Sequence, residues 1–195
     1  LTIEFTNTDT RPQDYDATAG HDRPSHADRT AYEKFGGWND PRGGGHFSGR
    51  LTLTLTAAGV VAKKMLPANV AFSTDIVEIG GCTEPERFDT LLHETAEAKD
   101  SVGGMVECRV QGVPAGLGDP YFDSAESVIA QLLFAIPGVK GVEFGSGFAG
   151  AQMRGSEHND PIVDAAGHTA TNHAGGIAGG LTNGNELVVR AAFKP

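Results

Sequence analysis

The chain has 195 residues, a formal net charge of −10 and a hydrophobic fraction of 39%. This composition is typical of a globular chain that folds as one domain, and it argues against disorder. The acidic balance argues against nucleic acid or an anionic membrane surface as the main partner, because both bind basic faces. The longest apolar run is LLFAI (132–136), far short of the roughly 18 residues of a membrane span.

The first third of the chain has little regular periodicity. Residues 1–6 alternate and predict a strand, whereas residues 7–50 predict one long loop. Loops longer than about 15 residues inside a compact domain are usually functional or disordered. Residues 51–66 begin with the strand-like LTLTLT and continue with the helix-like AAGVVAKKML. Local pattern therefore leaves strand and helix open for this segment.

The middle of the chain contains a predicted helix followed by a predicted strand. Residues 86–100 predict an amphipathic helix with Phe88, Leu91 and Leu92 on its apolar face, and His93 is interpreted as a structural histidine among them. Residues 106–113 predict a strand with one buried face, because Val106, Cys108 and Val110 alternate with Glu107, Arg109 and Gln111.

The last third contains the clearest helix. Residues 123–137 begin with Asp123 as the expected N-cap and end at Pro137. Residues 141–145 predict a short strand and 145–184 a second long polar segment. Asn183 and Gly184 then predict a hairpin turn into a final strand. That strand should place Leu187, Val189, Ala191 and Phe193 on one face. The order of elements favours an α+β or α/β fold.

Basic residues gather in one part of this acidic chain. Residues 23–50 hold five basic and three acidic residues, a local charge of +2, so the remainder carries −12. The same stretch contains His26, His46 and three consecutive glycines (43–45). Arginine offers a planar fork of donors to phosphate or carboxylate, glycine lets backbone approach a ligand closely, and histidine donates protons near neutral pH. The residues favour a pocket for an anionic small molecule with histidine acid catalysis, and the alternative is a solvated loop.

The sequence contains no motif for nucleotide binding, for a serine hydrolase or for a metal site. The glycine run lacks the Gly-Lys-Ser/Thr of a nucleotide P-loop and the G-x-G-x-x-G spacing of a dinucleotide fold, and no G-x-S-x-G elbow is present. His158, His168 and His173 could meet in space, but no H-E-x-x-H or paired-cysteine motif accompanies them. We therefore predict no metal, and we predict that Cys82 and Cys108 are free thiols in a cytoplasmic setting.

Several long motifs resemble chorismate synthase, in order and across the whole chain. They are RPSHAD (23–28), RGGGHFSGR (42–50), DSVGGMVECRVQGVPAGLGDPYFD (100–123), VKGVEFGSGF (139–148), MRGSEHND (153–160), NHAGGIAGGLTNG (172–184) and FKP (193–195). The resemblance implies an α+β fold of the family's β-α-β sandwich type, a single core domain over 1–195, and a homotetramer. It implies conversion of 5-enolpyruvylshikimate-3-phosphate to chorismate with reduced FMN, and it leaves open whether the enzyme reduces its flavin with NADPH.

The resemblance also assigns roles to individual residues. His26 matches the histidine that protonates the flavin, and it is the expected catalytic residue. The expected substrate-binding residues are Arg23, Gly49 and Arg50. The expected cofactor-binding residues are His46, Phe47, Ser48, Pro137, Gly138, Gly179 and Lys194. His46, Phe47 and Pro137 depart from the residues that many relatives carry at these positions.

Some family features lie outside these 195 residues. The G-E-S-H-G motif with the second essential histidine is not in the sequence, and the flavin phosphate loop begins only at Lys194. We therefore expect the chain to be the middle portion of the enzyme, partial in fold and inactive alone. The alternative is a non-catalytic fragment or an anion- or flavin-binding module that keeps the fold core only.

Overall fold

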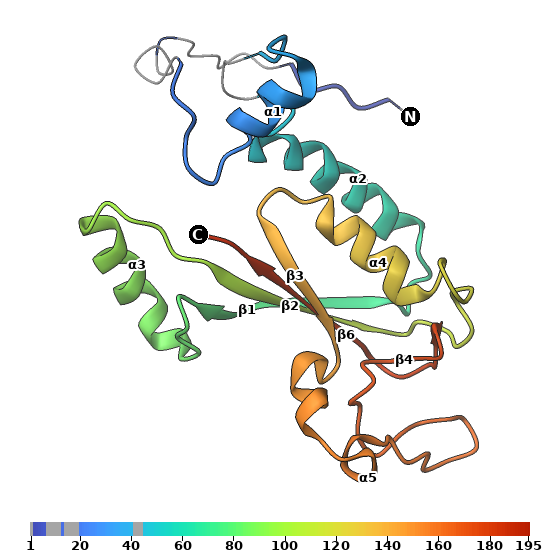
Figure 1. The fold of residues 1–195 in the computed structure, drawn as a ribbon. Helices are drawn as coiled ribbons and strands as arrows, with labels where there is room; N and C mark the ends of the chain where they lie inside the picture. The colour runs from blue at the N-terminus through green and yellow to red at the C-terminus, as the bar shows by residue number, and fades with distance from the viewer. Residues whose placement is uncertain (1, 7–12, 14–19, 41–44) are drawn as a thin grey trace. The chain divides into compact units, whose positions relative to one another are not determined.

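The computed structural model describes residues 2–6, 13, 20–40 and 45–195 (Figure 1). The chain divides into two compact units, Leu1–Met65 and Leu66–Pro195. Each unit is described here by itself, and the interpretation of residues 1–195 as one domain stays a prediction.

The first unit contains two α-helices. Helix α1 (Asp28–Phe35) begins with an acidic residue, which suits the positive end of the helix dipole, and ends at Gly36 with a left-handed φ of 58°. The expected loop over 7–50 is therefore wrong for residues 28–35, where one buried residue, Ala31, gave too little periodicity to reveal the helix. The expected strand over 1–6 is also wrong, since residues 2–6 form no regular element.

Helix α2 (Thr52–Met65) follows a short 3₁₀ turn, η2 (Gly49–Leu51), and settles the segment that local pattern left open. The hydroxyl groups of the alternating threonines donate to carbonyl groups three or four residues earlier, at 2.7–2.9 Å. These bonds let threonine, usually a strand former, sit in the first turns of a helix. The threonines involved are Thr52, Thr54 and Thr56.

The second unit is built on a four-stranded antiparallel sheet with the order β1-β2-β6-β3. Its strands are β1 (Ala71–Ile79), β2 (Gly104–Gln111), β3 (Val139–Phe144) and β6 (Leu187–Phe193). The strands predicted around 106–113, 141–145 and the C-terminal residues are thus confirmed. Strand β6, the last in the sequence, lies between β2 and β3, so the four-stranded sheet is complete only with the end of the chain in place (Figure 1).

Two helices connect the first three strands. Helix α3 (Phe88–Glu97) follows a 3₁₀ turn, η3 (Pro85–Arg87), and confirms the helix expected over 86–100. His93 on this helix is exposed, so its interpretation as a structural histidine of the apolar face is wrong. Helix α4 (Ala125–Phe134) packs against β3 (Figure 1).

The helix expected over 123–137 is confirmed as α4, but its N-cap is Ser124 rather than Asp123. The Ser124 hydroxyl accepts a hydrogen bond from the Ser127 N–H at 3.2 Å. The Asp123 carbonyl instead accepts the Asp119 N–H at 2.8 Å, which keeps Asp123 in an extended bridge before the helix begins. The N-cap of α4 is therefore one residue later than the sequence predicted.

The apolar face of the sheet forms the core of the second unit. The buried cluster joins Val110 on β2, Leu187 on β6, Ala125 on α4 and Ile177. Cys108 packs at its edge, as the alternation of β2 predicted, and both Cys82 and Cys108 are free thiols.

The segment 145–184 contains short elements. They are η4 (Gly147–Gln152), α5 (Gly155–His158), β4 (Ile177–Ala178) and β5 (Leu181–Thr182). Strand β5 pairs with β4 and not with β6, so the hairpin expected at Asn183 and Gly184 is wrong. The hairpin turn is formed by Gly179 and Gly180, whose φ angles of 61° and 84° are both in the left-handed region that a type I′ turn requires.

Candidate functional site

The motif RPSHAD folds into a tight turn that leads into α1. The His26 N–H donates to the Arg23 carbonyl at 3.2 Å, which closes a four-residue turn. Pro24 takes the second position and Ser25 the third, with a φ of 60°. Proline followed by a residue with positive φ is the pattern of a type II turn. The local sequence thus fixes the path of the backbone around His26.

A carboxylate closes this turn from the other side. Asp28 Oδ2 accepts hydrogen bonds from the Arg23 backbone N–H (3.0 Å) and from Arg23 Nε (2.8 Å). Asp28 Oδ1 accepts from Arg23 Nη2 at 2.8 Å. The Arg23 guanidinium holds the pKa of Asp28 at about 2, below its ordinary value of 3.8. Asp28 is therefore charged at neutral pH, and a bidentate pair of this kind fixes the plane of the guanidinium.

The His26 side chain is held by its own turn. Its Nδ1 lies 2.9 Å from the Pro24 carbonyl oxygen, and the residue is exposed. A carbonyl oxygen can only accept, so Nδ1 carries the proton in this bond. The other ring nitrogen, Nε2, remains for chemistry.

The glycine-rich motif supplies the second group of candidate residues in the first unit. His46 and Phe47 are exposed, and residues 43–44 of the glycine run lie outside the described residues. The Ser48 hydroxyl accepts the Arg50 N–H at 3.2 Å and caps η2. Gly49 has no heavy atom within 4 Å of the place where a Cβ would stand. A flat ligand could approach the backbone there, and the exposed Arg50 extends from the next position.

In the second unit, Gly138 and Lys194 are brought together. The Lys194 N–H donates to the Gly138 carbonyl at 2.9 Å, next to the exposed Pro137. Gly179 lies at the other end of α4, because the Ala125 N–H donates to the adjacent Gly180 carbonyl. Ten helical residues separate these ends by about 15 Å. A ligand that contacts both Gly179 and the Gly138–Lys194 pair must therefore extend along the length of α4.

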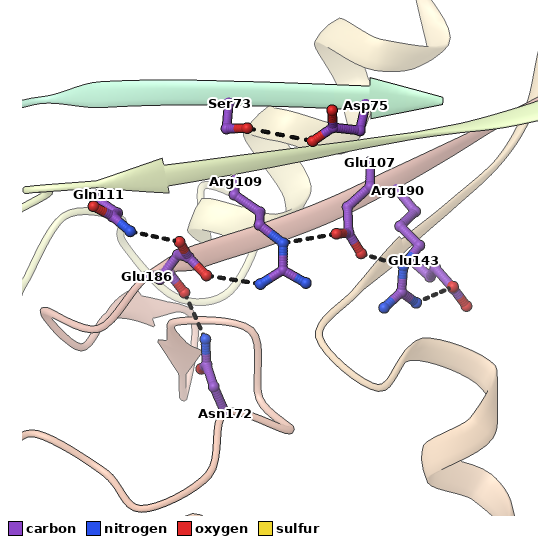
Figure 2. Close-up of polar contacts among 9 residues, drawn as sticks. All are labelled: Ser73, Asp75, Glu107, Arg109, Gln111, Glu143, Asn172, Glu186 and Arg190. Carbon is purple, nitrogen blue, oxygen red and sulfur yellow. Dashed lines mark hydrogen bonds and ion pairs between the residues drawn. The ribbon is translucent and has the colours of Figure 1, made fainter. Parts of the chain in front are cut away.

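The polar face of the sheet carries a chain of ion pairs that sequence reasoning left out (Figure 2). Glu107 on β2 accepts from Arg109 Nε and Arg190 Nε, both at 2.7 Å. Arg190 also binds Glu143 on β3 at 2.6 Å, and Arg109 binds Glu186 at 2.9 Å. The alternation of charged residues at 107 and 109 with apolar ones was the signal that could have predicted this face.

This network shifts the pKa values of its members in the direction of charge. Burial alone would raise the pKa of Glu107, but hydrogen bonds from Arg190 and Arg109 outweigh it and lower that pKa below 4.5. Burial would lower the pKa of Arg190, yet hydrogen bonds to Glu143 and Glu107 raise that pKa above its ordinary value. The network borders an open cavity of about 230 Å³, in which Arg109 and Arg190 are already bound by carboxylates. It therefore ties β2, β6 and β3 together rather than offering charge to an anion.

Beside this cavity, Ser146 and His173 form a second polar pair. The Ser146 hydroxyl and His173 Nδ1 are 2.8 Å apart, and the rings of His173 and His158 are 5.6 Å apart between centroids. Asp160 accepts the N–H groups of His173 and Ala174, both at 2.8 Å, and so fixes this loop. His168 contacts Asp164 instead, at 2.6 Å. Within the described parts of the chain, no three potential metal ligands gather in one place.

These features define an α+β protein. Its first unit contains the turn from Arg23 to the exposed His26, and its second unit contains a sheet whose strands are joined by ion pairs. The family model for chorismate synthase matches residues 1–195. A chorismate synthase from Chitinophaga pinensis is 56% identical over all of this chain, and one from Thermococcus gammatolerans is 44% identical over 219 aligned residues. The chain therefore belongs to the chorismate synthase family.

A solved structure supports the fold. The crystal structure of a chorismate synthase matches 87% of this chain with a TM-score of 0.80 and 30% sequence identity. The chain spans 58% of the Chitinophaga relative, 62% of the Thermococcus relative and 63% of the crystallised chain. In the described residues, no helix combines the length and the apolar character needed to cross a bilayer.

Proposed function

We propose that this chain forms part of an enzyme with chorismate synthase activity. The enzyme would convert 5-enolpyruvylshikimate-3-phosphate to chorismate by a 1,4-elimination. The carbon–oxygen bond to phosphate breaks with its electron pair on the phosphate, a ring proton leaves, and a second ring double bond forms. The observation that carries this proposal is the family match over residues 1–195, together with 56% identity to a curated relative.

The residues of the first unit would receive the substrate, which carries a phosphate and two carboxylates. Arg50 would offer a guanidinium fork to these anions, and Gly49 lets the backbone approach them. Arg23 would add positive charge while its Nε and Nη2 stay bonded to Asp28. His26 would act as the acid beside the flavin, since it is exposed and its Nδ1 is already bonded. A positioned acid contributes roughly 10²–10⁴ in rate.

The chemical character of the expected cofactor residues fits reduced FMN. Gly49 and Gly179 both have open space where a Cβ would stand, and Phe47 offers an exposed ring. In the second unit, Gly138 with Lys194 and Gly179 at the far end of α4 suit an extended ligand. We propose His46, Phe47, Ser48, Pro137, Gly138, Gly179 and Lys194 as its contacts. Reduced FMN, when bound, supplies an electron transiently and recovers it.

Further properties belong to the same proposal. We propose a homotetramer in the cytoplasm, acting on a small molecule and not on nucleic acid or membranes. The net charge of −10 supports the last two points, because those partners attract basic proteins. We also propose that residues 1–195 alone turn over little substrate, since the family's second histidine motif is not among them.

An anaerobic assay tests the activity. The natural protein is mixed with reduced FMN and 5-enolpyruvylshikimate-3-phosphate, and chorismate is followed by its absorbance. Chorismate formation that requires both the protein and reduced FMN supports the proposal. Flavin binding without any chorismate would overturn it in favour of a flavin-binding module. The 195-residue chain is assayed in parallel, where turnover equal to that of the natural protein would contradict the expected inactivity.

A further inference from the structure

The turn around His26 contains one charged residue to which neither the motif nor the proposed mechanism gives a task. Asp28 accepts three hydrogen bonds from Arg23, one from its backbone and two from its guanidinium. All three distances lie between 2.8 and 3.0 Å. Exposed ion pairs usually contribute little, but bidentate arginine–carboxylate pairs are the exception. The carboxylate therefore fixes both the start of the turn and the side chain that begins it.

The same turn determines which nitrogen of His26 carries the proton. The Pro24 carbonyl can only accept, so the 2.9 Å contact requires a proton on Nδ1. When the ring is charged, both nitrogens carry protons and the Nδ1 bond is unchanged. When Nε2 gives up its proton, the neutral ring left behind already has the tautomer that Pro24 stabilises. Release of the Nε2 proton thus needs no rearrangement of the ring.

Strain in the turn explains why a clamp is needed. Ser25 has a φ of 60°, in the left-handed region, which costs a non-glycine residue roughly 1–2 kcal/mol. The backbone hydrogen bond from the His26 N–H to the Arg23 carbonyl is 3.2 Å long, near the long end of the usual range. The three short bonds to Asp28 hold Arg23 in place against this strain. The position of the Pro24 carbonyl, and with it the tautomer of His26, depends on that hold.

We propose that Asp28 is a positioning residue, which clamps the Arg23–His26 turn so that Nδ1–H of His26 stays on the Pro24 carbonyl and Nε2 is the atom that gives up the proton. The low pKa of Asp28, about 2, keeps the clamp charged at the pH of any assay near neutrality. The claim that Nε2 gives up a proton during catalysis rests on the proposed function. The claim that the neutral ring carries its proton on Nδ1 does not.

Ring-nitrogen NMR on the natural protein with isotope-labelled histidine tests the inference directly, because a protonated and an unprotonated ring nitrogen have distinct shifts. The His26 signal is assigned by its loss in His26→Ala. At a pH where the ring is neutral, the wild-type protein should show the proton on Nδ1. In Asp28→Asn, which keeps the shape but loses the charge and one acceptor, the signal should shift towards a mixture of tautomers. Arg23→Lys, which breaks the bidentate pair from the other side, should produce the same shift.

The matched control is Glu33→Gln, which removes an exposed carboxylate that pairs with Arg29 on the same helix. It should leave the His26 signal and turnover unchanged. Partners that orient metal-binding histidines contribute roughly 10–100-fold in activity. Asp28 orients His26 through Arg23 and the turn, and we expect Asp28→Asn to lower kcat by a factor in the same range. Circular dichroism separates this outcome from loss of α1.

The two proposals fail in different ways. A wild-type His26 with its proton on Nε2, or an unchanged signal in both Asp28→Asn and Arg23→Lys, would overturn the clamp even in a fully active enzyme. Absence of chorismate formation in the wild-type protein would overturn the proposed function and leave the tautomer result standing.

Discussion

The two units of the chain hold their polar side chains by different means. In the first unit, the bonds Arg23–Asp28, His26–Pro24 and Arg50–Ser48 join residues two to five positions apart. In the second unit, Arg190 and Arg109 bind carboxylates 47, 77 and 83 positions away. The short-range bonds of the first unit need only the local backbone to be folded. The ion pairs of the second unit need the complete sheet, because their partners are far apart in the sequence.

The burial of apolar side chains differs in the same sense. Among the described residues, Ala31 alone is a buried hydrophobic residue in Leu1–Met65, while eight lie in Leu66–Pro195. The second unit therefore supplies the hydrophobic free energy, and the first presents exposed chemistry. Changes at the exposed candidate residues of the first unit should alter rate or affinity, and changes in the core and the ion-pair network of the second unit should alter stability. The predictions below test this division, from the largest expected effect to the smallest.

Replacement of His26 by alanine should lower the rate of single turnover with reduced FMN by roughly 10²–10⁴, with the free energy of unfolding unchanged. The reason is that His26 is exposed and makes only a local hydrogen bond. His21→Ala, which removes another exposed histidine of the same unit, should leave the rate intact. Single turnover of His26→Ala at the wild-type rate would show that the acid lies elsewhere.

Replacement of Leu187 by alanine should destabilise the protein by about 2–5 kcal/mol, because it leaves a cavity in the core. Leu187 is 8% exposed and belongs to the buried cluster on β6. Leu132→Ala on α4, where the side chain is 66% exposed, is the matched control and should cost far less. Urea unfolding of both variants gives the comparison, and equal costs would contradict the location of the core.

Two glycines with left-handed φ angles should respond differently to alanine. A Cβ at Gly145 (φ 55°) would collide with the backbone of His173 and Gly175, whereas a Cβ at Gly179 (φ 61°) would meet open space. Gly145→Ala should therefore cost clearly more than the roughly 1–2 kcal/mol of left-handed strain that both share. If thermal unfolding shows the same loss for both, the close packing at Gly145 is refuted. FMN titration of Gly179→Ala then reports whether that open space is used by the ligand.

Replacement of Glu107 by glutamine should destabilise the protein by roughly 1–3 kcal/mol, because two arginines lose a charged acceptor. The variant should also change the response to acid. The folded-state pKa of Glu107 is lowered below 4.5, so the carboxylate stabilises the fold above that pH and the contribution is lost as the pH falls through the folded-state value.

Urea unfolding of Glu107→Gln and wild type between neutral pH and acid measures both effects. The difference between the two proteins should shrink as the pH falls below 4.5. Glu97→Gln, at the exposed end of α3, controls for loss of a carboxylate and should leave the acid response as it is. A difference that stays constant with pH would show that charge is not what Glu107 contributes.

Replacement of Arg50 by lysine should raise the substrate dissociation constant about tenfold, since lysine keeps the charge but loses the planar fork and with it one charge-assisted bond. Arg87→Lys, on an exposed ion pair of the second unit, is the matched change and should leave affinity unchanged. Equilibrium binding of substrate without chemistry measures both, and unchanged affinity of Arg50→Lys would remove that residue from the site.

The sequence alone determined the elements whose periodicity matches their burial. Val106, Cys108 and Val110 alternate because one face of β2 is buried. Residues 125–134 form the helix that the sequence predicted before Pro137, although its cap is Ser124 and not the expected Asp123. Motif content also identified the family and the candidate residues, since these depend on residue identity and spacing. Where burial is slight, the pattern failed in two ways. Helix α1 had too little periodicity to be predicted, and the alternation of residues 1–6 predicted a strand that residues 2–6 do not form.

Tertiary structure decided what depends on partners distant in sequence or on the geometry of a turn. The LTLTLT segment is helical through local bonds from threonine hydroxyls to earlier carbonyls, which its alternation did not predict. The pairing of β5 with β4 goes with the left-handed angles of Gly179 and Gly180. The ion-pair chain from Glu186 to Glu143 exists only because β6 inserts between β2 and β3. The role proposed for Asp28 likewise rests on its three hydrogen bonds to Arg23, because the sequence shows that an acid follows the histidine but not which side chain it binds.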